Sequence, residues 1–131
     1  MNLLLDTQAL LWWRAGHRRL GRRARQAIES DATTVFVSAA SIWEMAIKVG
    51  LGKLRLKDPL DEWVPEALER HGFKMLSVSV AHAAAVASLP LHHADPFDRM
   101  LIAQARTEQL VIVTSDTAFD DYGVNALDAR A

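Results

Sequence analysis

Short, continuous apolar runs alternate along this sequence with longer amphipathic segments, and this alternation restricts the possible folds to a few. The first run is Leu3-Leu4-Leu5, and further apolar or β-branched runs lie near residues 35, 75 and 112. An unbroken apolar run of this length is typical of a strand buried on both faces, as in a parallel sheet. Strands that alternate with helices predict helices on both faces of that sheet. We therefore expect one domain over residues 1–131, a three-layer α/β/α sandwich with a mainly parallel central sheet.

The pattern also predicts where the elements lie, although it does not give the order of the strands in the sheet. The expected strands cover residues 2–5, 33–37, 73–78 and 110–113, with a further candidate at 124–127. The expected helices cover residues 7–14, 18–30, 38–49, 59–70, 81–89 and 96–108. Glycines after several of these helices, such as Gly16 and Gly72, are typical C-terminal caps.

Composition excludes several classes of protein. The chain has no cysteine, so disulfides, thiolate zinc sites and cysteine nucleophiles are excluded. No apolar run approaches the ~20 residues of a membrane span, and the N-terminus does not resemble a secretion signal, so we expect a cytoplasmic protein with no membrane partner. The net charge of −1 hides an asymmetry, because residues 1–57 carry +6 and residues 58–131 carry −7. A basic half can attract a polyanion, whereas clustered acids can attract a cation.

Four acidic residues are expected at one edge of the sheet. Asp6 directly follows the first strand and Asp116 follows the fourth, which places both at the carboxyl edge. Asp98 lies in the first turn of the helix that leads into the fourth strand, and Glu44 lies one to two turns into the helix after the second. Helix and strand rises bring all four within reach of that edge, where open α/β sheets bind ligands.

Each acid also has an ordinary structural explanation. Asp6 can cap the following helix, and Asp116 can be a turn residue. Ser41-Ile42-Trp43-Glu44 matches a capping box, and Glu44 can also pair with Lys48 four residues on. Asp95-Pro96-Phe97-Asp98 is typical of a helix start, with Asp95 as the cap.

Several carboxylates at close range repel one another unless protons or a hard cation offset their charge. Oxygen ligands without cysteine favour Mg²⁺ or Mn²⁺ over Zn²⁺. A metal at such a site can activate a water and stabilise charge on a phosphoryl oxygen, and basic residues can contact phosphates. The pattern thus indicates phosphodiester hydrolysis, with Arg18, Arg22 and Arg25 as candidate RNA contacts if their helix borders the acidic edge.

At these residues the chain resembles the PIN-domain ribonucleases, and among them the VapC-type toxins of type II toxin–antitoxin modules. The matching segments are Leu3-Leu4-Leu5-Asp6-Thr7, Ser41-Ile42-Trp43-Glu44 with Lys48, the block from His93 to Ala105, and Val113-Thr114-Ser115-Asp116 with Phe119. They span nearly the whole chain in the order found in the family, and the Asp-Pro-Phe-Asp-Arg block is the most specific of them.

The resemblance implies an endoribonuclease that depends on Mg²⁺ or Mn²⁺. Its acidic quartet corresponds to Asp6, Glu44, Asp98 and Asp116, with Asp6 and Asp98 as the firmest metal ligands and the other two completing the site directly or through water. Matching polar positions, which hold the acids or the substrate phosphate, are Thr7, Thr114, Ser115 and Asp95. The family also implies a homodimer, an RNA substrate and a cognate VapB-type antitoxin whose tail occupies the acidic groove.

Two other functions remain open at this point. One is a different metal-dependent phosphate hydrolase, such as a phosphatase with Asp6 as nucleophile, although the second acid of such enzymes is replaced here by Gln8. The other is a non-toxic module of the same fold that binds RNA or protein. The paired His92 and His93 can suggest a metal site or a general base, but their position in a loop favours a structural role.

Overall fold

The computed structural model describes residues 1–131 and contains one five-stranded sheet. The strands are β1 (Asn2–Leu5), β2 (Thr34–Ser38), β3 (Lys74–Leu76), β4 (Val111–Thr114) and β5 (Ala126–Asp128). Their order across the sheet is β3-β2-β1-β4-β5, and all four pairings are parallel. The parallel sheet is confirmed, and the candidate fifth strand belongs to it.

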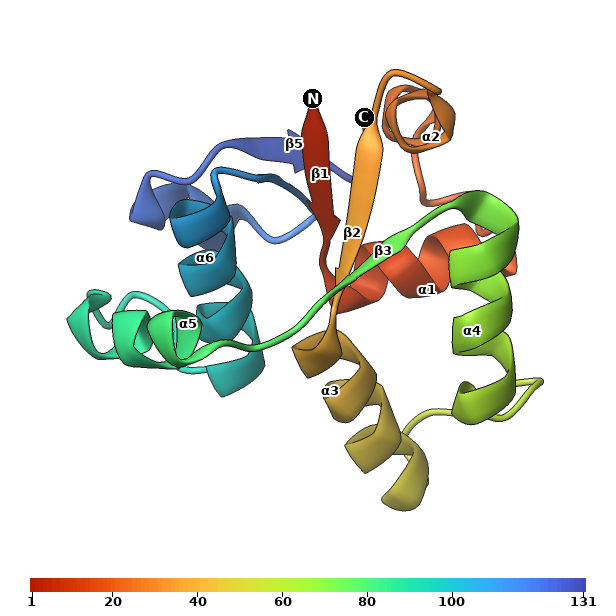
Figure 1. Ribbon diagram of the computed structural model, residues 1–131, viewed down its shortest axis with the longest axis horizontal. Coiled ribbons are helices and arrows are strands. Elements are labelled where there is room, and N and C mark those ends of the chain that lie inside the picture. The colour runs from red at the N-terminus through yellow and green to blue at the C-terminus, as the bar shows by residue number, and fades with distance from the viewer.

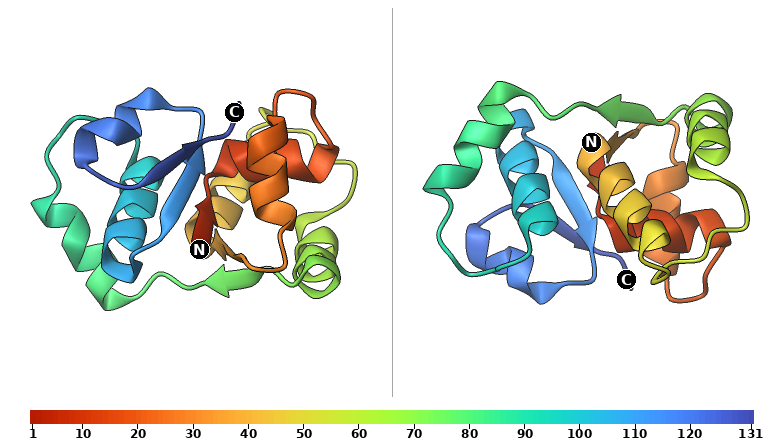
Figure 2. Two further views of the ribbon diagram at one scale, coloured as in Figure 1. Left: turned by 90° about the horizontal axis from the view of Figure 1, so that it is seen from above. Right: turned by 90° about the horizontal axis from the view of Figure 1, so that it is seen from below.

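Helices cover both faces of this sheet, as Figures 1 and 2 show. The α-helices are α1 (Thr7–Ala15), α2 (Arg22–Glu29), α3 (Ala39–Gly50), α4 (Leu60–His71), α5 (Val80–Ala85) and α6 (Pro96–Glu108), and two 3₁₀ helices are η1 (Val86–Ser88) and η2 (Thr117–Tyr122). The core on one face is built with α1, α2 and α4, and the core on the other with α6, η1 and η2. The three-layer sandwich is therefore confirmed. None of its helices combines the length and the apolar character that crossing a membrane requires.

The central strand β1 explains the continuous apolar run at the start of the chain. Leu3 and Leu5 belong to the core cluster that contains Leu10 of α1, whereas Leu4 belongs to the opposite cluster with Ile102 of α6. All three leucines of the strand are fully buried. Because successive side chains of a strand point to opposite faces, a strand between two helical layers needs an apolar residue at every position.

The second helix is shorter than the sequence predicts. We expected residues 18–30, but α2 begins at Arg22 with Gly21 as its N-cap. The backbone N–H of Gly21 donates to Ala129 O (2.8 Å), and a Cβ at this position would lie 2.2 Å from Ala131 O. The C-terminal residues therefore occupy the space beside Gly21, and this tertiary contact sets the start of α2.

The expected helix over residues 81–89 is also divided. It begins at Val80 behind the cap of Ser79, ends at Ala85 and continues as the 3₁₀ turn η1. The cap is reciprocal: the Ser79 hydroxyl accepts from the backbone N–H of His82, and His82 Nδ1 accepts from that of Ser79 (3.1 and 3.0 Å). The preceding strand covers only residues 74–76 of the expected 73–78 and lies at the edge of the sheet.

Candidate active site

The four predicted acids do converge at the carboxyl edge of the sheet. Asp6 and Asp116 follow the neighbouring strands β1 and β4, and the backbone N–H of Asp6 donates to Val113 O at the end of β4 (3.0 Å). The negative charges of Asp116 and Glu44 both raise the pKa of Asp6, and those of Asp6 and Glu44 raise the pKa of Asp98. The structure therefore brings together carboxylates from four separate segments, as the sequence predicts.

Two of these acids also cap helices. One carboxylate oxygen of Asp6 accepts from the backbone N–H of Ala9 (2.7 Å), and one of Asp116 accepts from that of Ala118 (2.9 Å). The structural explanation offered for Asp6 is thus confirmed, and that for Asp116 holds as the cap of η2. Each cap engages a single oxygen, so the same bond that orients the carboxylate leaves its second oxygen for another partner.

At the start of α6, the cap and the site are divided between two residues. Asp95 Oδ1 accepts from the backbone N–H groups of Phe97 and Asp98 (2.8 and 3.1 Å), so Asp95 is the N-cap. Pro96 occupies the first turn, where its missing N–H costs nothing. The carboxylate of Asp98 is therefore not needed for capping and is available to the site.

Glu44 is buried and held by two neighbours. Its Oε1 accepts from the Thr7 hydroxyl (2.6 Å), and its Oε2 pairs with Lys48 Nζ (2.9 Å), as the spacing of four residues predicts. The capping-box explanation is wrong, because α3 begins earlier: Ser38 is the N-cap and accepts from the backbone N–H of Ala40. Ser41 Oγ is buried and has no hydrogen-bond partner.

A buried hydrogen bond links the helices that carry Glu44 and Asp98. The Ser38 hydroxyl donates to Gln104 Oε1 (2.6 Å), and both side chains are fully buried. Ser38 caps α3, and Gln104 lies in the middle of α6. The two acid-bearing helices are thereby fixed to each other at the edge of the sheet.

The electrostatics of the site show an excess of negative charge. Burial raises the pKa of Asp6 from 3.8 to about 6, an effect that a side-chain hydrogen bond with Thr114 partly opposes. Burial and the charge of Asp95 raise the pKa of Asp98 to about 7. The hydrogen bond with Glu44 raises the pKa of Lys48, whose ammonium therefore stays charged. Carboxylate oxygens are hard donors that suit Mg²⁺ or Mn²⁺, and such an ion would offset the repulsion among these clustered acids. The residues present therefore fit such an ion.

The predicted polar residues take different places around the acids. Besides its bond with Asp6, the Thr114 side chain accepts from the backbone N–H of Asp116 (3.0 Å). Thr7 holds Glu44, as described above. Ser115 is half-buried in the turn between Thr114 and Asp116. Two threonines thus contact the acids directly.

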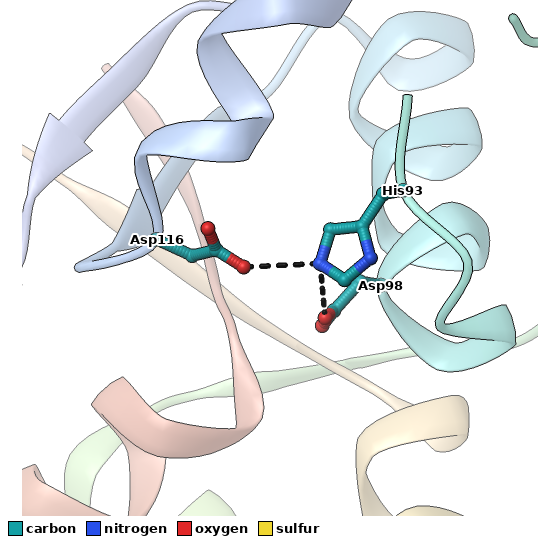
Figure 3. A group of neighbouring side chains, drawn as sticks. All are labelled: His93, Asp98 and Asp116. Carbon is teal, nitrogen blue, oxygen red and sulfur yellow. Dashed lines mark hydrogen bonds and ion pairs between the residues drawn. The ribbon is translucent and has the colours of Figure 1, made fainter. Parts of the chain in front are cut away.

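His93 lies among the acids of the candidate site, although its position in the sequence favoured a purely structural role. Its Nε2 lies 3.0 Å from Asp98 Oδ2 and 3.0 Å from Asp116 Oδ2 (Figure 3). The contact with Asp116 is a hydrogen bond. These three side chains form the group whose ligand atoms lie within 4.8 Å of one another. The signal available in the sequence was the position of His93 inside the same block as Asp98. His92 instead packs its ring against Tyr122.

The loop that carries His93 is anchored from two elements. The Tyr122 hydroxyl of η2 accepts from the backbone N–H groups of His92 and His93 (3.0 and 2.7 Å). The guanidinium of Arg99 donates to the backbone oxygens of Pro90 and Val86 (2.9 and 3.2 Å). Arg99 thus holds the loop that precedes α6, a role that its place in the sequence does not reveal.

The arginines proposed as RNA contacts do not border the acids in this chain. Figure 1 shows α2, with Arg22 and Arg25, beside the start of β2, whereas α1 and α3 begin at the opposite edge. Arg25 lies 4.0 Å from Glu29 of the same helix, and Arg18 lies in the turn before it. These arginines were candidate RNA contacts only if their helix bordered the acidic edge, and within one copy of the chain it does not.

A cavity of about 380 Å³ opens between α1, α2 and α4. It is lined by Trp13, Trp63 and several charged side chains, including Arg25 and Glu66. None of the four converging acids lines it. The four acids therefore lie outside this cavity.

Comparison with known proteins shows which family and which relatives this chain resembles. The family model of the PIN domain matches residues 3–125. Over 72 residues the chain is 39% identical to Ribonuclease VapC16 of Mycobacterium tuberculosis, a match that covers 52% of this chain and 51%, about half, of that relative's length.

Two solved structures are similar in fold. VapBC2 from Rickettsia felis, bound to a DNA fragment from its promoter, matches with a TM-score of 0.73 and 15% identity over 97% of this chain and 98% of that chain. A toxin–antitoxin complex from Klebsiella pneumoniae matches with a TM-score of 0.65 and 20% identity over 97% of each chain. At these identities the structures show the fold alone.

Proposed function

This chain belongs to the PIN domain family, and on that premise we propose that it is a Mg²⁺- or Mn²⁺-dependent endoribonuclease that acts as the toxin of a VapBC-type toxin–antitoxin module. The observation that carries the proposal is the convergence of Asp6, Glu44, Asp98 and Asp116 at one sheet edge, with burial and mutual repulsion raising the pKa values of Asp6 and Asp98. Folding places these charges together at a cost in stability, which a bound cation would offset.

The acids divide into two groups by the role that we assign to them. Asp6 and Asp98 have the raised pKa values and would be the principal ligands of the ion. Glu44, fixed by Thr7 and Lys48, and Asp116, fixed by its cap, would complete the site or orient the attacking water. When bound, the ion supplies Lewis-acid activation of water and phosphate. The charged ammonium of Lys48 places a positive group beside these acids, where a phosphate of the substrate would meet it.

RNA as the substrate and a toxin role rest on the relatives. The chain is 39% identical over 72 residues to a protein named a ribonuclease, and it shares its fold with a chain of a toxin–antitoxin complex. We extend the proposal to a VapB-type antitoxin as partner and to a homodimer. The helix α3 offers a face for a second copy, since Trp43, Ile47 and Leu51 follow one another at four-residue spacing and are all exposed.

A cleavage assay tests the enzymatic part. A labelled single-stranded RNA is incubated with the purified protein in Mg²⁺, in Mn²⁺ and in EDTA. We expect cleavage only with a divalent ion, and we expect Asp6→Asn or Asp98→Asn to abolish it while circular dichroism shows an unchanged fold. Asp61→Asn is the matched control, because Asp61 also lies in the first turn of a helix but on α4. Full activity of both site variants would refute the assignment, and a phosphorylated Asp6 trapped with a phosphate ester would favour a phosphatase instead.

Expression in cells tests the toxin role. Induction of this chain alone should arrest growth, and co-expression of the adjacent antitoxin gene, or the Asp6→Asn substitution, should restore it. Growth that continues although the purified protein cleaves RNA would separate the nuclease from the toxin assignment. Sedimentation of the wild type and of Trp43→Ser tests the homodimer, which we expect the substitution to weaken.

A further inference from the structure

We propose that His93 is a positioning residue that donates its Nε2–H to the carboxylate of Asp116, lies beside the carboxylate of Asp98, and does not itself coordinate the metal ion. The metal-related part of this inference rests on the proposed function, whereas the state of the imidazole ring is a property of the chain alone. The contacts that surround the two ring nitrogens carry it.

The first step is the tautomer of the ring. His93 Nδ1 accepts from the backbone N–H of Asp95 (3.2 Å). An amide N–H can only donate, so Nδ1 must present its lone pair, and the ring proton of a neutral imidazole then lies on Nε2. Coordination of an ion by Nε2 would require that proton to move to Nδ1, where it would face the amide hydrogen of Asp95. The loop therefore selects a hydrogen-bond donor over a metal ligand.

The second step is the fixed place of the ring. The backbone N–H of His93 donates to the Tyr122 hydroxyl (2.7 Å), and the ring meets the buried Phe119 edge-on with centroids 6.1 Å apart. Arg99 holds the preceding turn of the loop through backbone oxygens. The Nε2–H is thus aimed by contacts from α6 and η2, and it does not depend on the carboxylates for its position.

The third step is what this donor does to the acids. Asp116 is held on both oxygens, by the backbone N–H of Ala118 at Oδ1 (2.9 Å) and by His93 Nε2 at Oδ2 (3.0 Å). The same nitrogen lies 3.0 Å from Asp98 Oδ2 (Figure 3). The Nε2–H that binds Asp116 therefore also lies against the carboxylate of Asp98, so the positive end of this N–H dipole stands between two carboxylates that would otherwise repel each other. Partners of this kind, which orient ligands without touching the ion, typically change metal affinity 10- to 100-fold.

Nuclear magnetic resonance of the imidazole nitrogens tests the tautomer. Two-bond nitrogen–proton correlation spectra are recorded at one pH on the metal-free protein and on the protein saturated with Mg²⁺. We expect His93 to show a protonated Nε2 and a lone pair on Nδ1 in both spectra, with His92 as the internal comparison. A protonated Nδ1, or an Nε2 that loses its proton when Mg²⁺ binds, would overturn the inference.

Calorimetric titration with Mn²⁺ tests the positioning role. We expect His93→Ala to weaken Mn²⁺ binding at least tenfold and His93→Gln, whose side-chain amide can still donate from the place of Nε2, to bind within about threefold of the wild type. The matched control is His92→Gln, which changes the neighbouring histidine without touching an acid and should bind as the wild type does. Unchanged or tighter Mn²⁺ binding by His93→Ala would overturn the role.

These readouts separate the inference from the proposed function. If the protein binds Mn²⁺ with the expected order of variants but cleaves no RNA, the ribonuclease proposal fails and the role of His93 stands. If the wild type binds no divalent ion, the proposed function fails together with the metal-related part of this inference. If cleavage is observed, excess Mn²⁺ should restore the activity of His93→Ala but not that of Asp98→Asn, because only the second variant lacks a ligand.

Discussion

Replacement of Asp98 by asparagine should stabilise the metal-free protein at neutral and alkaline pH. Burial and the charge of Asp95 raise the pKa of Asp98 from 3.8 to about 7 in the folded state, and its side chain is 22% exposed. Each pKa unit corresponds to about 1.4 kcal/mol, so a shift of about three units sets an upper limit of about 4 kcal/mol. Because some solvent still reaches the carboxyl, we expect a gain of about 2–4 kcal/mol in the free energy of unfolding.

The pH dependence fixes the sign of the effect. The folded state holds the Asp98 proton more tightly than the unfolded chain does, so wild-type stability falls as pH rises from about 4 to about 7. Below this window the carboxyl is protonated in both states and asparagine offers no advantage. The gain from Asp98→Asn should therefore be near zero at pH 4 and complete at pH 8.

Urea unfolding in EDTA at these two pH values, followed by circular dichroism, measures the difference. Asp61→Asn serves as the control, since this exposed first-turn acid of α4 should show no gain at pH 8. Added Mg²⁺ should stabilise the wild type but not Asp98→Asn at pH 8. A variant no more stable than the wild type at pH 8, or equally stabilised at both pH values, would refute the reasoning about buried charge.

Three further substitutions test the contacts around the site. Thr7→Val removes the 2.6 Å hydrogen bond to Glu44 and should lower the free energy of unfolding by about 2 kcal/mol, whereas Thr7→Ser should not, as urea titration would show. Arg99→Lys replaces a fork that binds several carbonyl oxygens, so hydrogen exchange in the loop that precedes α6 should accelerate while α6 itself stays protected. Gly21→Ala places a Cβ 2.2 Å from Ala131 O and should cost about 1–3 kcal/mol in the same urea assay; an unchanged midpoint would show that the C-terminus moves freely.

Much of the candidate site could be predicted because it follows from strand direction. In a parallel sheet, a residue directly after a strand lies at the carboxyl edge, so the positions of Asp6 and Asp116 depend only on locating β1 and β4. The caps of Asp6 and Asp95 were likewise visible, since N-caps need only a few neighbouring residues. Glu44 pairs with Lys48 as its helical spacing predicts.

Other features could not be predicted, because they depend on segments far apart in the chain. The start of α2 is set by the C-terminal residues beside Gly21. The capping box assigned to Glu44 fails for a local reason instead, because Ser38, the first residue of the expected helix over residues 38–49, is itself the N-cap. The location of α2 away from the acidic edge depends on the path of the chain between α1 and β2, which the hydrophobic pattern does not encode.

The amino-acid pattern alone predicts the layers of this protein, the parallel sheet and the edge at which its acids gather. These follow from hydrophobic period and from the fixed rises of helices and strands, which are local properties. The packing of distant segments, in contrast, sets the strand order, the pKa values of about 6 and 7 at Asp6 and Asp98, and the place of His93 between Asp98 and Asp116. Burial, repulsion and hydrogen bonding act through space, so their outcome is fixed only when distant segments are packed together.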